Sequence, residues 1–370
     1  MRRTLPLLAA VAVLVVACTG GTSGASASPG ATADIKRSKL DITYSALVDG
    51  DVHKVSSKKV LQGAIDALVA EAKKTGGKAD FPTIDLQDVS EPVNADFKKF
   101  ADAAGQFASR NPQITPDRLA DLAIEAMIGA SPDCHTYYVD KNRTVHRSRP
   151  EPTSGSAARI PSTGTTLGGP DQIGLTAKLL SGGIIYVTFN EFLVSGTYKV
   201  TDEVKKMLDK GVAAGAKAWL FDLRGNVGGN GAVLMASWFL SGEPTLKIVV
   251  RTGAAGTASA NKDLRLPAAY QLPIAVVQND RGGSAPEVFA ASLKESKRAT
   301  IVGGKSVGCL GATSLTDMSD GSKLAIAVQE FTGAVTGTPY NNNGIPPDVQ
   351  ADDATAVDKA IEILRQKIGS

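Results

Sequence analysis

The N-terminal third of the chain has the hydrophobic period of helices. From Ser57, apolar residues recur every three or four positions up to a Gly-Gly pair, and a second such run spans about residues 93–108. A third follows Thr115-Pro116-Asp117, a helix cap with proline at the first helical position. The mixed, polar pattern of residues 35–52 predicts no clear element. We therefore expect an N-terminal helical subdomain over residues 34–145.

The pattern changes from about Ile173. Short apolar runs typical of buried strands alternate with helical periods, which predicts a largely parallel sheet with helices on its faces. The expected strands lie at 184–189, 218–223, 248–251, 274–277, 299–302 and 324–330, and the expected helices at about 197–212, 232–240, after Ser284 and at 354–367. The segment 146–172 is rich in Pro, Ser, Thr and Gly and reads as a linker. The predicted class is α/β, with a core over 173–370.

The segment 1–33 differs in composition from the rest of the chain. Two arginines precede a short apolar stretch that ends at Ala17-Cys18, as in a secretory signal peptide with a bacterial lipobox. We expect residues 1–18 to be the signal, Cys18 to carry lipid on the extracytoplasmic face of the cell membrane, and 19–33 to be a flexible tether. The alternative is ordinary cleavage after a nearby alanine.

Composition limits the classes of partner. The 370 residues are 43% hydrophobic and 21% charged, enough for a sizeable core, and the net charge of +3 gives no nucleic-acid footprint. His53, His135 and His146 lack metal-ligand spacing with carboxylates or cysteines, so we expect no metal and no cofactor.

Candidate chemistry begins at residues 280–292, DRGGSAPEVFAAS. A predicted strand ends, two glycines turn the chain, and Ser284 stands where a helix begins. A hydroxyl there lies beside unpaired backbone N–H groups that can stabilise an oxyanion, one way to present a nucleophile. The alternative is that Ser284 only caps the helix, with Glu287 completing a capping box.

Two other segments remain ambiguous by themselves. The glycine-rich turn at 225–231 lacks the ending of a P-loop and the spacing of a dinucleotide fingerprint, but its N–H groups can hold an oxyanion. His135, in SPDCHTYY, is either a base or a polar turn residue.

Four segments, in order, resemble one family. SPDCHTYY is similar to its Asp-x-His-Thr motif, LFDLRGNVGGN to its Asp-Leu-Arg-x-Asn-x-Gly-Gly motif, GGSAPEVF to its nucleophile segment, and DGSKLAIAV with GIPPDV to its closing segment. The chain thus resembles the C-terminal-processing (tail-specific) serine peptidases, relatives of the tricorn core, over roughly residues 57–368. The resemblance implies a crotonase/Clp-like catalytic core, and the short linker after His146 implies a member without a PDZ domain.

The resemblance also implies roles. Ser284 falls on the nucleophile, His135 on the general base of the tricorn-like branch, and Gly228 or Gly229 with the N–H of Ala285 on the oxyanion hole.

Two positions depart from the family. The position of the lysine that serves as base in the tail-specific branch is occupied by Cys309 here, which argues against a Ser-Lys dyad. The position of the glutamate that orients the histidine in the tricorn-like branch is occupied by Asn341, which can orient imidazole but supplies no charge. We therefore expect either slower chemistry than a carboxylate would give or a different orienting residue.

Cys134 and Cys309 both map near this site through the resemblance. In an oxidising compartment they are expected to form a disulfide that braces it, the alternative being two buried free thiols.

We therefore expect a membrane-tethered extracytoplasmic serine endopeptidase acting on polypeptides. The alternative is a weak or inactive relative that binds peptides or apolar ligands, favoured by the missing lysine and by Asn341. A purely structural lipoprotein leaves the motifs unexplained.

Overall fold

The computed structural model describes residues 36–149 and 159–369. The predicted signal peptide, the lipidated Cys18 and the tether lie outside the described residues. In the two described stretches, every helix is too short or too polar to cross a lipid bilayer.

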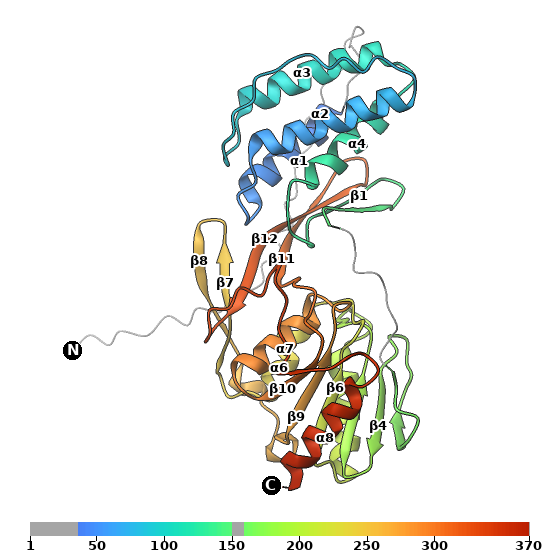
Figure 1. Cartoon of the computed structure of the whole chain (residues 1–370), viewed down its shortest axis with the longest axis vertical. Helices are drawn as coiled ribbons and strands as arrows, with labels where there is room; N and C mark the ends of the chain where they lie inside the picture. The colour runs from blue at the N-terminus through green and yellow to red at the C-terminus, as the bar shows by residue number, and fades with distance from the viewer. Residues whose placement is uncertain (1–35, 150–158, 370) are drawn as a thin grey trace, which may run out of the picture. The chain divides into compact units, whose positions relative to one another are not determined.

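Helices form the N-terminal part of the described chain (Figure 1). They are α1 (Arg37–Ser45), the π-helical turn η1 (Ala46–Gly50), α2 (Ser57–Lys74), α3 (Asn94–Arg110) and α4 (Pro116–Ile128). The last three confirm the helical periods, and the Thr115 hydroxyl caps α4 by accepting from the N–H of Arg118 at 3.3 Å. The helix α1 was not predicted. Its Leu40 and Tyr44 are buried at helical spacing, but polar neighbours hide that pattern.

A seven-stranded sheet forms the core of the C-terminal part, in the order β13-β10-β9-β6-β5-β4-β3. The first five strands are parallel, and β4 and β3 are antiparallel additions. Its strands are β3 (Thr165–Gly168), β4 (Thr176–Leu180), β5 (Ile184–Thr188), β6 (Ala218–Asp222), β9 (Ile274–Gln278), β10 (Ala299–Gly303) and β13 (Val349–Gln350). The predicted α/β class with parallel strands is confirmed.

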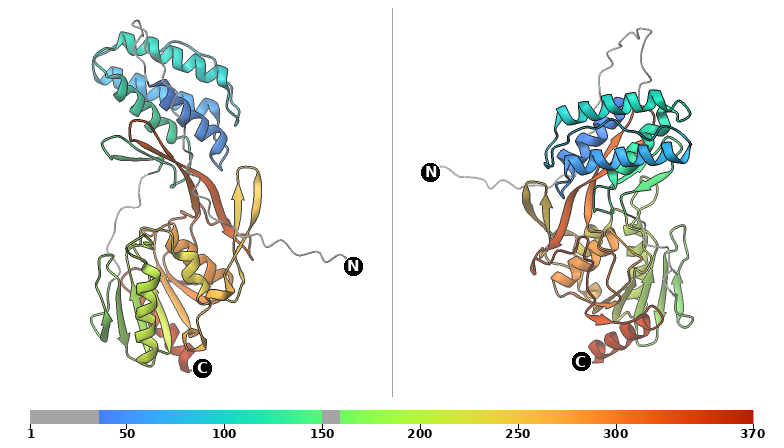
Figure 2. Two further views of the ribbon diagram at one scale, coloured as in Figure 1. Left: turned by 180° about the vertical axis from the view of Figure 1, so that it is seen from behind. Right: turned by 45° about the horizontal axis from the view of Figure 1, so that its top comes forward.

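Both faces of this sheet are covered by helices, which explains its continuous apolar strands (Figure 2). Alternate residues point to opposite faces: Ile185 and Val187 pack in the core under α5, α6 and α7, whereas Ile184 and Tyr186 pack under α8. These helices are α5 (Val200–Ala213), α6 (Ala232–Ser237), α7 (Ala285–Glu295) and α8 (Ala356–Gly369).

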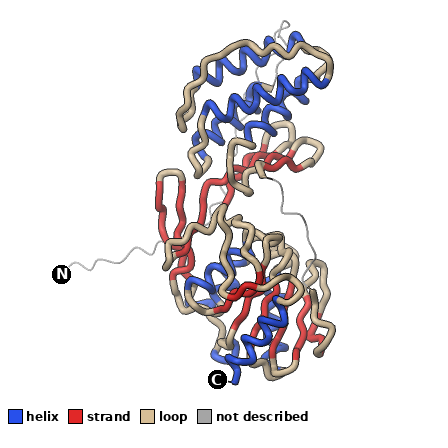
Figure 3. Tube along the Cα trace, in the orientation of Figure 1, coloured by secondary structure: helices blue, strands red, loops and turns tan. Residues whose placement is uncertain are grey.

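A second, six-stranded sheet was not predicted (Figure 3). Two of its strands were expected, at 248–251 and 324–330, but as part of the largely parallel core sheet; the structure corrects this by placing them in the second sheet as β7 and β12. It contains β1 (Tyr137–Val139), β2 (Val145–Arg147), β7 (Pro244–Val250), β8 (Gly253–Ser259), β11 (Gly311–Asp317) and β12 (Lys323–Gly333). Its pairs are all antiparallel. The long strand β12 pairs with β1 near its start and with β7 near its end.

The second sheet joins distant parts of the sequence. Leu324 and Ile326 of β12 share the core of the N-terminal helices. The predicted linker also holds structure: Val145–Arg147 overlaps its start, and Thr165–Gly168 is the edge strand β3. Each is an edge strand that pairs with one neighbour along the chain, β2 with β1 and β3 with β4, so pairing defines these strands where local composition predicts a linker.

Candidate active site

Ser284 occupies a strained turn between β9 and α7. Its φ of 69° and ψ of −113° lie where a residue with a side chain is rarely found. The two glycines before it supply a tight turn: a Cβ on Gly282 would lie 3.0 Å from the carbonyl oxygen of Leu223. The turn presents the hydroxyl at the N-terminus of α7, as the sequence predicts, on a residue that is partly exposed.

Glu287 stabilises the turn that carries Ser284 through hydrogen bonds. Its buried carboxylate accepts hydrogen bonds from the N–H of Ser284 at 3.0 Å, from the N–H groups of Gly308 and Cys309 at 2.7 Å each, and from the Ser306 hydroxyl. Burial raises the pKa of Glu287, and these four donors oppose the rise. The residue identified as half of a capping box therefore also fastens the segment 306–309 to the nucleophile turn.

The glycine turn after β6 lies against the same serine. A Cβ on Gly228 would come within 3.0 Å of the Ser284 Cβ, so only glycine fits there. The N–H of Gly228 already donates to the Asn226 side chain at 3.1 Å. Among the described residues, the N–H groups of Gly229 and Ala285 have no such partner, which makes them the two available members of the predicted oxyanion hole.

His135 faces Ser284 from the loop before β1. Its Nε2 lies 3.2 Å from the Ser284 Oγ, so the structure brings together two residues 149 positions apart. Its Nδ1 lies 3.1 Å from Oδ1 of Asp133, and the same oxygen accepts the backbone N–H of His135 at 2.8 Å. Hydroxyl, imidazole and carboxylate thus follow one another as in a catalytic triad.

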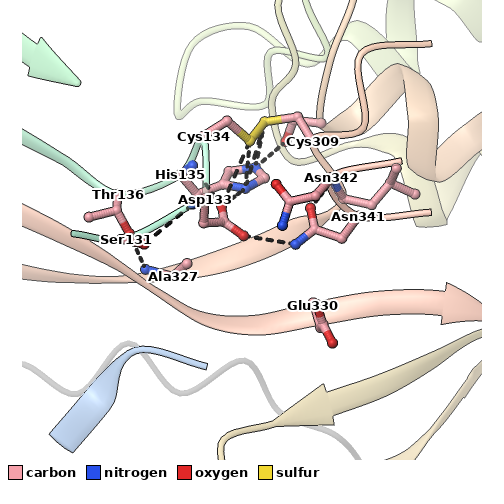
Figure 4. Close-up of polar contacts among 12 residues, drawn as sticks. Ser131, Asp133, Cys134, His135, Thr136, Cys309, Ala327, Glu330, Asn341 and Asn342 are labelled. Carbon is pink, nitrogen blue, oxygen red and sulfur yellow. Dashed lines mark hydrogen bonds and ion pairs between the residues drawn. A yellow bond between two sulfur atoms is a disulfide. The ribbon is translucent and has the colours of Figure 1, made fainter. Parts of the chain in front are cut away.

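Asn341 contacts a different group from the one predicted. Its Nδ2 donates to Oδ2 of Asp133 at 2.8 Å (Figure 4). Its Oδ1 accepts the N–H of Leu310 at 3.0 Å. The prediction that Asn341 orients the imidazole itself is corrected: Asp133 orients His135, and Asn341 holds Asp133. The carboxylate beside the imidazole thus comes from Asp133, in the loop that carries His135, and not from position 341.

Asp133 is a charged group in a buried place. Its side chain is 0% exposed, whereas that of His135 is 14% exposed. Burial pushes the pKa of Asp133 upward, but hydrogen bonds from His135, His53 and Asn341 outweigh burial and hold this pKa well below its usual range. The Asp133 carboxylate is therefore ionised at neutral pH, and it can stabilise a protonated His135 ring.

The loop 131–136, which carries the predicted base His135 and is called the base loop below, is hydrogen-bonded to β12. The Thr136 hydroxyl oxygen accepts the N–H of Ala327 at 3.1 Å and the hydroxyl of Ser131 at 3.1 Å (Figure 4). These bonds explain the threonine of the Asp-x-His-Thr motif, because they fix the backbone on which His135 stands.

Cys134 and Cys309 form a disulfide with a Cα–Cα distance of 6.0 Å. The bridge lies against the His135 ring (Figure 4) and joins the base loop to the segment held by Glu287. The two sulfurs and a His135 nitrogen are close enough to share a metal ion, but sulfurs bonded to each other are not thiolate ligands. Because Cys309 replaces the family's lysine, no amine reaches Ser284 from this position.

Sequence reasoning gave no role to two residues of this site. Asp133 stands just before Cys134 and the base, inside the recognised motif, so its position was an available signal. His53, whose Nε2 lies 2.9 Å from Oδ2 of Asp133, is 80 residues away and had no local signal.

Known proteins resemble this chain in sequence. Residues 183–351 match Peptidase family S41. The chain is 27% identical over 254 residues to a carboxyl-terminal-processing protease of Synechocystis sp., covering 63% of this chain and 56% of that protein. It is 26% identical over 179 residues to the carboxy-terminal processing protease CtpA of Bacillus subtilis, covering 48% of this chain and 36% of that protein. The chain therefore spans about half or less of these relatives.

A solved structure extends the likeness of fold to the helical part. A lipoprotein from Streptococcus agalactiae matches 93% of this chain and 100% of its own, with a TM-score of 0.53 and 13% sequence identity. The serine turn, the glycine turn and their parallel sheet all lie within the region matched by sequence. Residues 183–351, a little less than half of the chain, are thus similar to peptidase family S41.

Proposed function

We propose that this protein is a serine endopeptidase, with Ser284 as nucleophile, His135 as general base and Asp133 as the residue that orients the base. The observation that carries the proposal is the contact of 3.2 Å between Ser284 Oγ and His135 Nε2, backed by a buried carboxylate on Nδ1.

The geometry fits acyl transfer step by step. Asp133 keeps the proton of His135 on Nδ1, which leaves Nε2 free to accept the Ser284 proton as Oγ attacks a peptide carbonyl. The N–H groups of Gly229 and Ala285 are the donors for the resulting oxyanion. Protonated His135 then gives its proton to the leaving amine, and a water molecule, activated in the same way, releases the acyl group.

The substrate in this proposal is a polypeptide of the extracytoplasmic space. Support comes from the names of the relatives, which are carboxyl-terminal-processing proteases, and from the predicted signal peptide. The tether is a lipid on Cys18 in the same proposal, resting on the lipobox sequence. The disulfide agrees with an oxidising location.

The alternative of a binding protein loses one of its two supports. It rested on the missing lysine and on Asn341, and Asp133 now supplies the charge that Asn341 lacks. No contact in the described residues favours a ligand-binding role over catalysis.

A fluorophosphonate probe tests the proposal directly, because it reacts with an activated serine and needs no known substrate. We expect the full-length protein in detergent to be labelled, and Ser284→Ala and His135→Ala to lose labelling. Ser292→Ala is a matched control, since Ser292 is a buried serine of α7 whose hydroxyl donates to the carbonyl of Val288. An unlabelled wild type with its disulfide intact would contradict the proposal.

A further inference from the structure

His53 is a largely buried histidine that the mechanism above does not use. Only 16% of its side chain is exposed. It stands just after the N-terminal helix α1 and turn η1, far from the other site residues in sequence. Its Nε2 nevertheless lies 2.9 Å from Oδ2 of Asp133.

The backbone holds His53 in this place. The N–H of His53 donates to Asp51 Oδ1 at 2.8 Å, and the N–H of Val52 donates to the carbonyl of Ala327 on β12 at 2.9 Å. Arg251 adds a hydrogen bond to the carbonyl of Asp51 at 3.0 Å. The turn is thus pinned to the same strand that holds the base loop, next to Thr136.

The hydrogen bonds of Asp133 divide into two pairs. Oδ1 accepts the backbone N–H and Nδ1–H of His135, whereas Oδ2 accepts from His53 and Asn341. A carboxylate has about four lone-pair positions, so all are used. Rotation of the Asp133 side chain would break the bonds on Oδ2, and these bonds therefore fix the direction of the oxygen that faces His135.

We propose that His53 is a positioning residue of the peptidase site: by donating its Nε2–H to Oδ2 of Asp133, it fixes the carboxylate that orients the base. The inference rests on the proposed function. It assigns the N-terminal segment a positioning role in the site, because the site is then incomplete without the turn that follows α1 and η1.

The charges around His53 favour this role. Asp51 and Glu330 face it in addition to Asp133, with Nδ1 of His53 4.0 Å from Glu330. Burial lowers the pKa of His53, but the Asp133 hydrogen bond and these carboxylates outweigh burial and raise it. Because Asp133 is an acceptor, it keeps a proton on Nε2 of His53 whether or not Nδ1 is also protonated. The hydrogen bond between Nε2 and Asp133 therefore persists over the pH range in which the enzyme would act.

Two amide variants separate the hydrogen bond from the other properties of the ring. His53→Gln places an amide nitrogen near the position of Nε2, where it can still donate to Asp133. His53→Asn carries the same amide one methylene shorter and cannot reach. Both variants are neutral, so they share the loss of charge and differ in the bond to Asp133.

The measurement is the rate of fluorophosphonate labelling of the full-length protein, separated into the maximal rate and the half-saturating probe concentration. We expect His53→Gln to keep a maximal rate within about threefold of wild type, and His53→Asn to lose about tenfold at an unchanged half-saturating concentration. Circular dichroism and mass spectrometry of the disulfide verify the fold of each variant.

Each outcome has a distinct meaning. Equal maximal rates for the two variants, whether high or low, would overturn the role of the hydrogen bond. An unlabelled wild type would overturn the proposed function and this role with it, whereas a labelled wild type beside two equal variants overturns the role alone.

A second readout does not depend on activity. The chain has three histidines, so the ring nitrogens can be assigned in ¹⁵N spectra with single His→Gln variants. We expect His53 Nε2 to remain protonated and protected from solvent exchange in wild type. Rapid exchange of this proton at every pH tested would contradict the proposed bond.

Discussion

The two halves of the active site are built in different ways. The nucleophile half is local: β9, two glycines, Ser284 and α7 follow one another along the single segment 274–295. The base half is assembled from separate places, since His53, the loop 131–136 and Asn341 meet at one carboxylate. The nucleophile depends on backbone geometry, whereas the base depends on a side-chain network.

This difference predicts how each half fails. A change in the base half should lower activity in a protein that is still folded, because the network aims one imidazole. A change in the nucleophile turn should appear in stability as well, because the turn holds its backbone in a strained conformation.

The largest expected effect follows replacement of Asp133. Asp133→Asn removes the charge that stabilises the imidazolium and the acceptor that fixes the proton on Nδ1. We expect kcat or the maximal labelling rate to fall by about 10³–10⁴-fold. A loss of less than about tenfold in a folded variant would mean that another group orients His135.

The disulfide joins the two halves of the site, so its removal should lower the stability of the folded protein. It links residues 175 positions apart, and a cross-link over so long a loop stabilises by roughly 3–5 kcal/mol. We expect the double variant Cys134→Ser/Cys309→Ser to lose about that much free energy of unfolding, measured by urea denaturation. A reductant should lower the free energy of unfolding of wild type by a similar amount. The same reductant should leave the free energy of unfolding of the double variant unchanged.

Asp133 also predicts a pH dependence of stability. Its pKa is depressed in the folded state, so its ionised form stabilises the fold above the unfolded pKa of about 4, and this contribution is lost as pH falls toward the folded pKa. We expect a loss of about 2 kcal/mol from this one group. Wild type should therefore lose more stability than Asp133→Asn between about pH 5 and pH 2, measured by denaturation at each pH. Parallel curves would contradict the assignment.

Asn341→Ala should have a smaller effect on activity. It removes one of the two donors to Oδ2 of Asp133 and leaves the other, from His53. We expect labelling to slow by about tenfold, the cost of one hydrogen bond to a charged group. Asn343→Ala is the control, because the Asn343 side chain donates to backbone carbonyls of its own turn, those of Pro339 and Asn341; equal rates in the two variants would remove Asn341 from the site.

The smallest effect tests the nucleophile turn. Ser284→Gly and Ser284→Ala both lack the hydroxyl, but only glycine adopts a φ of 69° and ψ of −113° without strain. We expect the glycine variant to be more stable than the alanine variant by about 1 kcal/mol in free energy of unfolding. If alanine were as stable as glycine, the turn would relax once the hydroxyl is gone.

Much of the fold was predictable because its signals are local. The helices at 57–74 and 116–128 have clear periods and caps, and the parallel strands are continuous apolar runs. The antiparallel sheet was missed for the opposite reason. The strand β8 (Gly253–Ser259, GAAGTAS) has no strand-like pattern and exists because β7 pairs with it.

The sequence by itself determined the nucleophile half of this protein. A buried strand, a glycine turn and a serine at the start of a helix are neighbours along the chain, so their chemistry is legible before folding. Only the tertiary structure decided the base half: that Asp133 orients His135, that Asn341 and His53 hold Asp133, and that Cys134 meets Cys309. The physical reason is that a carboxylate is oriented by the donors that surround it. Here the donors come from three segments that are far apart in the sequence and meet only in the folded chain, where the turn of His53 and the loop of His135 both hydrogen-bond to Ala327 of β12.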